Sequence, residues 1–403
     1  MLSRRKILKR LSALPILGGL GGSTFAKTLS APSQPVVRDY FKELGVRTFI
    51  NAAGTYTSMT GSLMPKAVID AIDYARHQYV GLDDLQDKVG ARIAELLKCE
   101  SAMVTAGAAS AISLGTAGVL TGMDPEKAKR IPNDLSGMKS EVILQKTHRV
   151  GYDHAIRNCG VSLVEVETHE EMEAAINEKT AMLWFLNYAN PKGQVKYKEF
   201  IALGKKYGIP TFNDCAADVP PVENLWKYTQ MGFDLVCFSG GKGLRGPQSA
   251  GLLLGKKELI AAARLSAPPR GDTVCRTNKV NKEEILGMLV ALELFLNRDH
   301  EAQWKAWETQ IDHMHDAVAK IEGVDPEIHV PPIANHVPSL KIRWDQERVK
   351  ITPGKVREAL RLGHPSIETV GNEEYIGITS WMMNPGEERI VASRLAEILH
   401  AAG

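Results

Sequence analysis

The most distinctive stretch of the 403-residue chain is Phe238-Ser-Gly-Gly-Lys-Gly-Leu-Arg-Gly-Pro-Gln248. Its first two residues close Leu235–Ser239, an apolar run with the length of a buried strand. Four glycines flank Lys242, so the backbone there can approach a ligand closely. A dinucleotide-binding loop is not predicted, because Pro247 and another strand follow where such a loop would open a helix. The pattern predicts a lysine on a tight loop between two strands.

A lysine in this position suits Schiff-base chemistry with pyridoxal phosphate, for which a desolvated amine is nucleophilic. The alternative is a solvated loop lysine, since most lysines are exposed. Asp214 ends another strand-like stretch, about one crossover helix before Lys242. Open α/β sheets contact ligands at the carboxyl ends of strands, where an acid can hold the pyridine nitrogen protonated. The alternative for Asp214 is a helix N-cap.

A third element is Val104-Thr-Ala-Gly-Ala-Ala-Ser110, where a strand runs through small residues into an Ala-rich helix. Small side chains leave the first N–H groups of the helix open, and the helix dipole favours an anion such as phosphate. Close packing of an Ala-rich helix explains the composition equally well. The segment alone therefore leaves both interpretations open.

Short apolar strands alternate with helical patterns through the middle of the chain. Strand-length runs occur at Ala102–Thr105, Val142–Gln145, Leu163–Val166, Ala181–Leu186, Thr211–Asn213, Leu235–Ser239 and Ala250–Leu254. Nearly all-apolar strands between helices predict an α/β fold with a mostly parallel sheet covered on both faces. The pattern then changes, and the last elements expected are strands at Leu340–Trp344 and Tyr375–Thr379 and helices at Pro353–Leu362 and Glu387–Ala402. We therefore predict a large domain over residues 61–300 and a small α+β domain over residues 301–403.

The three pieces occur in the order found in fold-type I pyridoxal-phosphate enzymes. The strings around Ser110, Asp214 and Lys242 resemble those of bacterial selenocysteine synthase (seryl-tRNA selenium transferase) and of D-glucosaminate-6-phosphate ammonia-lyase. Further similar stretches are Gly45–Gly54, Arg276–Glu284 and Trp381–Glu388. The resemblance covers about residues 38–402 and implies the fold-type I transferase fold and pyridoxal 5'-phosphate as cofactor.

The resemblance also implies roles for individual residues. Lys242 would bind the cofactor aldehyde as an aldimine and later take the substrate's Cα proton. Asp214 would bind the pyridine nitrogen, His148 would stack on the ring, and Asn187 and Gln248 would contact the ring oxygen or the substrate. The expected phosphate donors are Ala106, Gly107, Ala108 and Ser239. Candidate clamps for a substrate carboxylate or phosphate are Arg47, Arg149, Arg270 and Arg276. The alternative for His148 is an exposed loop histidine, and the alternative for each arginine is an ordinary surface charge.

The reaction is less closely defined by these residues. We expect β-elimination from an amino acid or amino-sugar acid, with release of ammonia. Amino-acid racemisation and transamination stay open because both need only Lys242 and the same electron sink, and a protein that binds the cofactor or an amino acid without turnover is also possible. Selenium transfer to seryl-tRNA is disfavoured. Residues 1–26 carry five basic residues and no acidic one, so the remainder has 44 basic and 47 acidic residues, a formal charge of −3 that does not favour nucleic acid. We also expect no tRNA-binding segment before residue 38.

The N-terminus predicts export. Ser3-Arg-Arg-Lys-Ile-Leu-Lys9 resembles a twin-arginine signal, and the apolar run from Leu11 to Ala26 is too short to span a bilayer. We expect a signal peptide over residues 1–26, then a linker and N-terminal segment over residues 27–60, recognition by the export machinery, and a periplasmic protein without stable membrane insertion. The five cysteines lack CxxC spacing and are expected to be free thiols, which suits export in the folded state. We expect no metal site, and family members suggest a homodimer or a ring of dimers.

Overall fold

The computed structural model describes residues 38–403, so the predicted signal peptide lies outside the described residues. The described residues divide into two units, the first ending at Thr48 and the second spanning residues 49–403. In the first unit, α1 (Tyr40–Leu44) begins at Asp39, whose side chain accepts a hydrogen bond from the N–H of Lys42 at 3.0 Å. It ends at Gly45, whose φ of +67° is the left-handed conformation that glycine adopts without strain.

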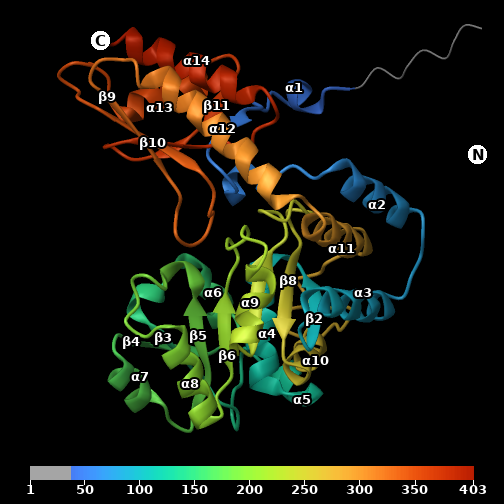
Figure 1. Cartoon of the computed structure of the whole chain (residues 1–403). Helices are drawn as coiled ribbons and strands as arrows, with labels where there is room; N and C mark the ends of the chain where they lie inside the picture. The colour runs from blue at the N-terminus through green and yellow to red at the C-terminus, as the bar shows by residue number, and fades with distance from the viewer. Residues whose placement is uncertain (1–37) are drawn as a thin grey trace, which may run out of the picture. The chain divides into compact units, whose positions relative to one another are not determined.

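The second unit contains a seven-stranded sheet with the strand order β2-β8-β7-β6-β5-β3-β4 (Figure 1). Only β8 runs antiparallel to its neighbours, and the other pairs are parallel. The strands are β2 Ser101–Thr105, β3 Glu141–Gln145, β4 Ser162–Val166, β5 Thr180–Leu186, β6 Thr211–Asp214, β7 Leu235–Ser239 and β8 Gly251–Gly255. The predicted strands and the mostly parallel α/β class are confirmed.

Helices cover both faces of this sheet, because alternate residues of each strand point into two separate apolar cores. On β5, Leu183 and Phe185 belong to one core and Met182 and Trp184 to the other. The first core is completed by α2 (Lys66–Arg76), α3 (Leu82–Leu97), α7 (His169–Ala175), α8 (Tyr197–Tyr207), α9 (Asn224–Met231) and α11 (Lys282–Leu296). The second is completed by α4 (Gly107–Thr121), α6 (His154–Arg157) and α10 (Lys257–Leu265), while α5 (Pro125–Arg130) packs against α4.

The C-terminal part of the chain forms a smaller layer of helices on a second sheet. This four-stranded sheet has the order β12-β13-β10-β9, with β9 Val324–His329, β10 Ser339–Trp344, β12 Val370–Gly371 and β13 Ile376–Thr379. Its core is shared with α12 (His300–Val318), α13 (Pro353–Leu362) and α14 (Glu387–His400). A two-stranded pair, β1 (Ile50–Asn51) with β11 (Ile367–Glu368), ties the start of the second unit to this region.

Two details differ from the sequence pattern or complete it. The region from Lys282 to Ile321 contains two helices, α11 and α12, because the Asp299 side chain accepts from the N–H of Ala302 at 2.9 Å and starts α12. Strand β9 was not predicted. It contains Pro326 and lies at the edge of its sheet, where proline is tolerated but breaks the apolar pattern.

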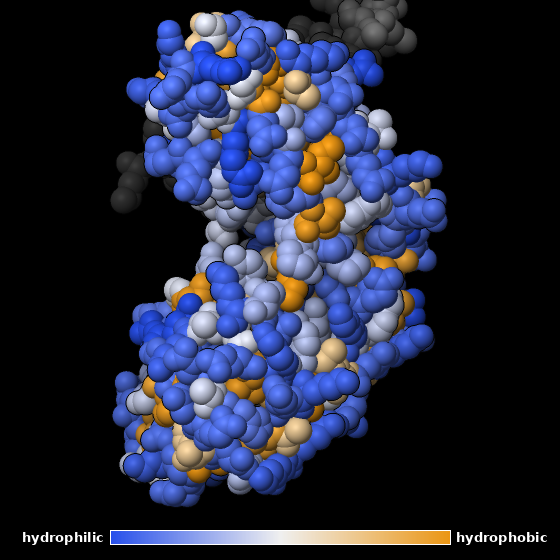
Figure 2. Space-filling view, turned by 60° about the vertical axis from the view of Figure 1, so that its left-hand side comes forward, coloured by the Kyte–Doolittle hydropathy of each residue, from blue (hydrophilic) through white to orange (hydrophobic). Residues whose placement is uncertain are grey.

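The surface of the molecule is largely hydrophilic in the view of Figure 2, with apolar residues in small groups. Among the described residues, no helix is both long enough and apolar enough to cross a membrane. All five cysteines are free thiols, as predicted, and only Cys99 is partly accessible.

Candidate active site

The predicted site residues gather where strands of the large sheet end. Asp214 and Ser239 are the last residues of the parallel neighbours β6 and β7, and the N–H of Ser239 donates to the carbonyl of Ala216 at 3.3 Å. Strand β2 ends at Thr105 on the same edge, because Thr105 pairs with Gly251, where β8 begins. The topology therefore brings the small-residue segment, the aspartate and the lysine loop to one edge of the sheet.

The lysine loop, residues 240–250, is packed too closely for side chains at its glycines. A Cβ on Gly243 would overlap the Val219 carbonyl oxygen, and one on Gly241 would overlap the backbone of Gln248. The loop is closed by hydrogen bonds from the N–H of Gly240 to the Ala250 carbonyl and from the N–H of Gly246 to the Gly240 carbonyl, both at 2.8 Å. The glycines flanking Lys242 thus hold its backbone in one place.

Asp214 is buried, with only 4% of its surface exposed. Its Oδ1 accepts from the N–H of Ala216 at 3.0 Å and from the thiol of Cys237 at 3.5 Å. Burial raises the pKa of this carboxyl, and the nearby positive charge of Lys242 opposes that rise. Both hydrogen bonds go to one oxygen, so the other can meet a cationic N–H donor.

Lys242 is half-buried, and it forms no ion pair with another described residue. Burial lowers the pKa of its ammonium group, while the charges of Asp214, Asp218 and Cys237 act in the opposite direction. Asp218 is a second buried acid at this edge, and sequence reasoning missed it. Burial raises its pKa to about 7, and the charge of Asp214 adds to the rise. Its Oδ1 accepts from the N–H of Ala334 at 3.2 Å.

Helix α4 starts directly at this edge without a capping side chain. Gly107 has a φ of +81°, and a Cβ on Gly251 would lie 2.6 Å from its carbonyl carbon and 2.8 Å from the nitrogen of Ala108. In the first turn, the hydroxyl of Ser110 is buried and has no hydrogen-bond partner. Open N–H groups at a helix start together with an unpartnered hydroxyl form a suitable cradle for an anion.

Asn187 lies at the start of η6 (Asn187–Ala189), directly after β5, and it is fully buried in a polar network. Its Nδ2 donates to Tyr228 at 2.9 Å, and its Oδ1 accepts from Tyr197 at 2.8 Å and from Asn213 at 3.2 Å. Its side chain also hydrogen-bonds Asp218 and lowers the pKa of that carboxyl. This network supports the loop that follows Asp214.

His148 is also fully buried, next to β5. Its Nδ1 accepts from the N–H of Leu186 at 3.1 Å, and its ring meets Phe185 edge-on at 4.4 Å between centroids. Burial lowers its pKa to about 4, so the ring is neutral at ordinary pH. Gln248, by contrast, is exposed and donates to the carbonyl of Thr57 at 3.3 Å. The roles of both residues toward the cofactor stay predictions.

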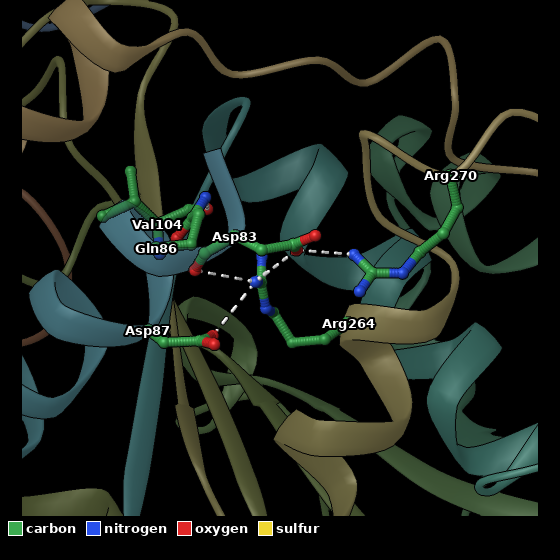
Figure 3. Close-up of polar contacts among 6 residues, drawn as sticks. All are labelled: Asp83, Gln86, Asp87, Val104, Arg264 and Arg270. Atoms are coloured by element: carbon green, nitrogen blue, oxygen red, sulfur yellow. Dashed lines mark hydrogen bonds and ion pairs between the residues drawn. The ribbon is translucent and has the colours of Figure 1, made fainter. Parts of the chain in front are cut away.

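Two of the candidate arginines form ion pairs with acidic residues. Arg270 donates to Asp83 at 2.8 Å, and the same carboxylate oxygen accepts from Arg264, which also reaches Asp87 at 3.0 Å (Figure 3). Arg149 pairs with Asp153 at 2.6 Å and with Glu165.

The other two candidate arginines are placed differently. Arg276 is exposed and has no ion-pair partner within the described part of the chain. Arg47 belongs to the first unit of the chain. The role of each of the four arginines toward the substrate stays a prediction.

Near Asp83 and Asp87, the side chain of Gln86 hydrogen-bonds the outer side of β2, a side that pairs with no other strand among the described residues. Its amide donates to the carbonyl of Val104 at 2.7 Å and accepts from the N–H of Val104 at 3.2 Å, as a neighbouring strand would (Figure 3). This side chain fixes the end of the strand that leads into the start of α4.

The residues present fit pyridoxal phosphate. Lys242 supplies an amine without an ionic partner for the aldehyde, and Asp214 supplies a buried carboxylate for the pyridine nitrogen. The start of α4, with the unpartnered hydroxyl of Ser110, suits the phosphate. Among the described residues, no group of three His, Cys, Asp or Glu side chains is arranged to hold a metal ion.

Comparisons with known proteins agree with this geometry. Residues 49–307 match the family described as SelA: L-seryl-tRNA selenium transferase. The chain is 28% identical over 379 residues to the D-glucosaminate-6-phosphate ammonia lyase of Salmonella typhimurium (strain 14028s / SGSC 2262), covering 90% of this chain and 98% of that protein. It is 26% identical over 375 residues to a 5'-C-glycyluridine monooxygenase-decarboxylase of Streptomyces sp, covering 89% and 92%.

A solved structure of D-glucosaminate-6-phosphate ammonia-lyase superposes with a TM-score of 0.79 at 26% identity, covering 91% of this chain and 99% of that one. The expected resemblance and cofactor are thereby confirmed. The chain belongs to the SelA (L-seryl-tRNA selenium transferase) family and is a pyridoxal-phosphate-dependent enzyme of fold type I.

Proposed function

We propose that the protein is an ammonia lyase acting on a 2-amino-3-hydroxy acid, either an amino acid or an amino-sugar acid. The observation that carries this proposal is that Lys242 and the buried Asp214 lie at the same end of the sheet, near enough for each to shift the pKa of the other, in a chain that aligns with 98% of an ammonia lyase. Selenium transfer to seryl-tRNA is the weaker alternative, because residues 27–403 carry a formal charge of −3.

The residues at the site suit proton removal at Cα. When bound, pyridoxal phosphate makes the Cα–H bond acidic by drawing electrons toward its ring. Asp214 can keep a proton on the ring nitrogen, which strengthens that effect. Because burial lowers the pKa of Lys242, its amine is more readily neutral and able to take the Cα proton.

The net conversion balances without an added oxidant or reductant. The Cα–H and Cβ–O bonds break, and the β-hydroxyl leaves as water after taking a proton. The resulting enamine takes a proton at Cβ, and water then replaces nitrogen at Cα, so the products are a 2-oxo acid and ammonia. Racemisation needs only the first proton transfer, and transamination would keep the nitrogen on the cofactor.

The decisive experiment measures ammonia and 2-oxo acid together. The purified protein is incubated with D- and L-serine, D- and L-threonine and D-glucosaminate, with Lys242→Ala as the matched control. We expect equal amounts of the two products from at least one compound, and none from the Lys242→Ala protein. Inversion at Cα without ammonia would replace the proposal with racemisation. Ammonia at the same rate from Lys242→Ala would remove the assigned site.

We further propose that the protein is exported folded to the periplasm and that it works as a homo-oligomer. The twin-arginine-like segment and the five free cysteines support export. Large apolar side chains exposed between residues 63 and 80 support self-association: Leu63, Ile69, Tyr74, Tyr79 and Val80. Light scattering after size-exclusion chromatography measures the oligomeric state. Export is tested by fractionating cells that produce either the wild-type protein or the Arg4→Lys/Arg5→Lys variant and comparing the amount of protein in the periplasm.

A further inference from the structure

Two buried polar atoms without hydrogen-bond partners lie at the end of β13. They are the indole Nε1 of Trp381, a residue that is 2% exposed, and Oγ1 of Thr379. Both lie beside Gly54, since a Cβ built on Gly54 would be 3.5 Å from Trp381 Nε1 and 3.8 Å from Thr379 Oγ1. These are ordinary contact distances, so both polar atoms lie beside the Cα of Gly54. A buried N–H without a partner is costly unless a ligand or water satisfies it.

The turn that carries Gly54 is held firmly. Asn51 Oδ1 accepts from the N–H groups of Ala53 at 3.1 Å and Gly54 at 2.9 Å, and its Nδ2 donates to the Gly54 carbonyl at 3.0 Å. The N–H of Thr379 donates to the Ala52 carbonyl at 2.9 Å. The φ of Gly54 is +117°, a conformation that other residues rarely adopt. The two unpartnered atoms therefore face a fixed backbone.

The same indole reaches the lysine loop. A Cβ on Gly243, the residue after Lys242, would lie 3.4 Å from Cζ3 of Trp381, on the ring edge away from Nε1. Arg245, in the same loop, is mostly buried and donates to the Trp381 carbonyl. The indole thus lies between the lysine loop and the Gly54 turn. A group bound at Trp381 Nε1 would be separated from the lysine loop by the width of the indole ring.

The two unpartnered donors are suited to a hydrogen-bond acceptor. The indole N–H can only donate, and the threonine hydroxyl can donate as well. Tyr56, whose Cε2 would be 3.9 Å from the same Cβ position, is 47% exposed, so the Gly54 turn lies next to a solvent-exposed side chain. Arg149 and Arg270, the candidate carboxylate clamps, are engaged by acidic residues elsewhere. Neutral donors near Lys242 are therefore available for this task.

We propose that Trp381 Nε1–H and Thr379 Oγ1–H bind a carboxylate oxygen of the substrate above Gly54. This inference rests on the proposed function, because it takes the substrate to be an amino acid bound through Lys242 and the cofactor. Hydrogen bonds to a charged group are the stronger kind, so two of them can orient the Cα–H bond toward the lysine.

The test uses two reagents that react with the lysine-bound cofactor and differ in the carboxylate. Aminooxyacetate carries one, and methoxyamine does not. The decay of the cofactor's visible absorbance band is followed in the holoenzyme for Thr379→Val, Thr379→Ser and Trp381→Phe. We expect the concentration of aminooxyacetate for half-maximal rate to rise about tenfold in Thr379→Val and Trp381→Phe, as for a lost bond to a charged group. Thr379→Ser should stay near wild type, and methoxyamine should react equally with all.

A matched control is Trp344→Phe, which removes an indole N–H that donates to the Ile351 carbonyl at 2.7 Å in the same domain. It should leave both reagents unaffected. A crystal structure of the holoenzyme treated with aminooxyacetate provides an independent readout, with a carboxylate oxygen expected within hydrogen-bond distance of Trp381 Nε1. Equal changes for both reagents, or none for aminooxyacetate, would overturn the inference and leave the lyase proposal standing. A wild-type protein with no cofactor band, or one unreactive toward both reagents, would remove the proposed function and this inference with it.

Discussion

At the amino end of the large sheet, Glu100 and Lys256 form an exposed ion pair at 2.6 Å. At the carboxyl end, Asp214 and Asp218 are buried and Lys242 is half-buried, and none of the three forms such a pair with another described residue. The hydrogen bond from Lys256 lowers the pKa of Glu100. At the other end, burial raises the pKa of both aspartates and lowers that of the lysine. Charged groups whose pKa values are shifted against ionisation mark a place built for a ligand.

The largest effect should come from Asp214. Replacing it with Asn removes the carboxylate that can hold a proton on the cofactor's ring nitrogen, so we expect turnover to fall by about two to three orders of magnitude. Asp234→Asn is the matched control at the amino end, where Asp234 accepts from the N–H and hydroxyl of Thr211, each at 2.8 Å. It should lower the melting temperature while leaving kcat unchanged. Similar losses of kcat in both variants would contradict the difference between the two ends.

A smaller loss is expected from the glycines of the lysine loop. Gly243→Ala would place a Cβ on the Val219 carbonyl oxygen and displace Lys242, so we expect activity to fall about tenfold or more. Gly271→Ala is the control, because nothing lies within 4 Å of a Cβ there. Steady-state kinetics and the cofactor absorbance of both variants check this. An unchanged Gly243→Ala enzyme would show that the loop has room to adjust.

The third test concerns stability against pH. Because the folded pKa of Asp218, about 7, lies above the unfolded value near 3.8, the folded state binds more protons between these values. Wild-type stability should therefore fall as pH rises from 4 to 7 and level off above, by at most about 4 kcal/mol from this group. Asp218→Asn should flatten the curve of melting temperature in that window. If the melting temperature changed with pH in the same way in both proteins, Asp218 would not be the group responsible for the pH dependence.

The smallest effect is expected at the amino end. Glu100→Gln breaks the exposed pair with Lys256, which should cost about 0.2–1 kcal/mol in unfolding free energy and disappear at high salt. Chemical denaturation with and without 0.5 M NaCl, roughly three times physiological ionic strength, measures it. If Glu100→Gln destabilised the protein as much as Asp234→Asn, the exposed ion pair would contribute more to the stability of the amino end than expected.

The sequence predicted the elements better than the contacts between them. Strand positions were predictable because the strands are short apolar runs, and Lys242 and Asp214 stood out because glycines and strand ends surround them in the chain itself. The ion pair of Arg270 with Asp83 could not be predicted, because the two residues are 187 positions apart in the chain. In the sequence, Trp381 stands out only as part of a stretch similar to the family, because its approach to Gly54 depends on the packing of β13 against the start of the second unit.

Asp218 shows a second kind of limit. It is four residues from Asp214 in the printed sequence, yet nothing local indicates that it is buried. Its burial follows from the loop at Ala334 and Asn335, whose N–H groups reach the Asp218 carboxylate at 3.2 Å and the Ala217 carbonyl at 2.8 Å. Both residues have positive φ, which no pattern of apolar spacing reveals.

The central claim is that Lys242 and Asp214 form the centre of a pyridoxal-phosphate site. Its most direct measurement is the visible absorbance of the purified protein with added cofactor, before and after borohydride reduction, followed by peptide mass mapping. We expect an absorbance band that the Lys242→Ala protein lacks, and a reduced cofactor adduct on the peptide containing Lys242. An adduct on another lysine, or a band that persists in Lys242→Ala, would contradict the account.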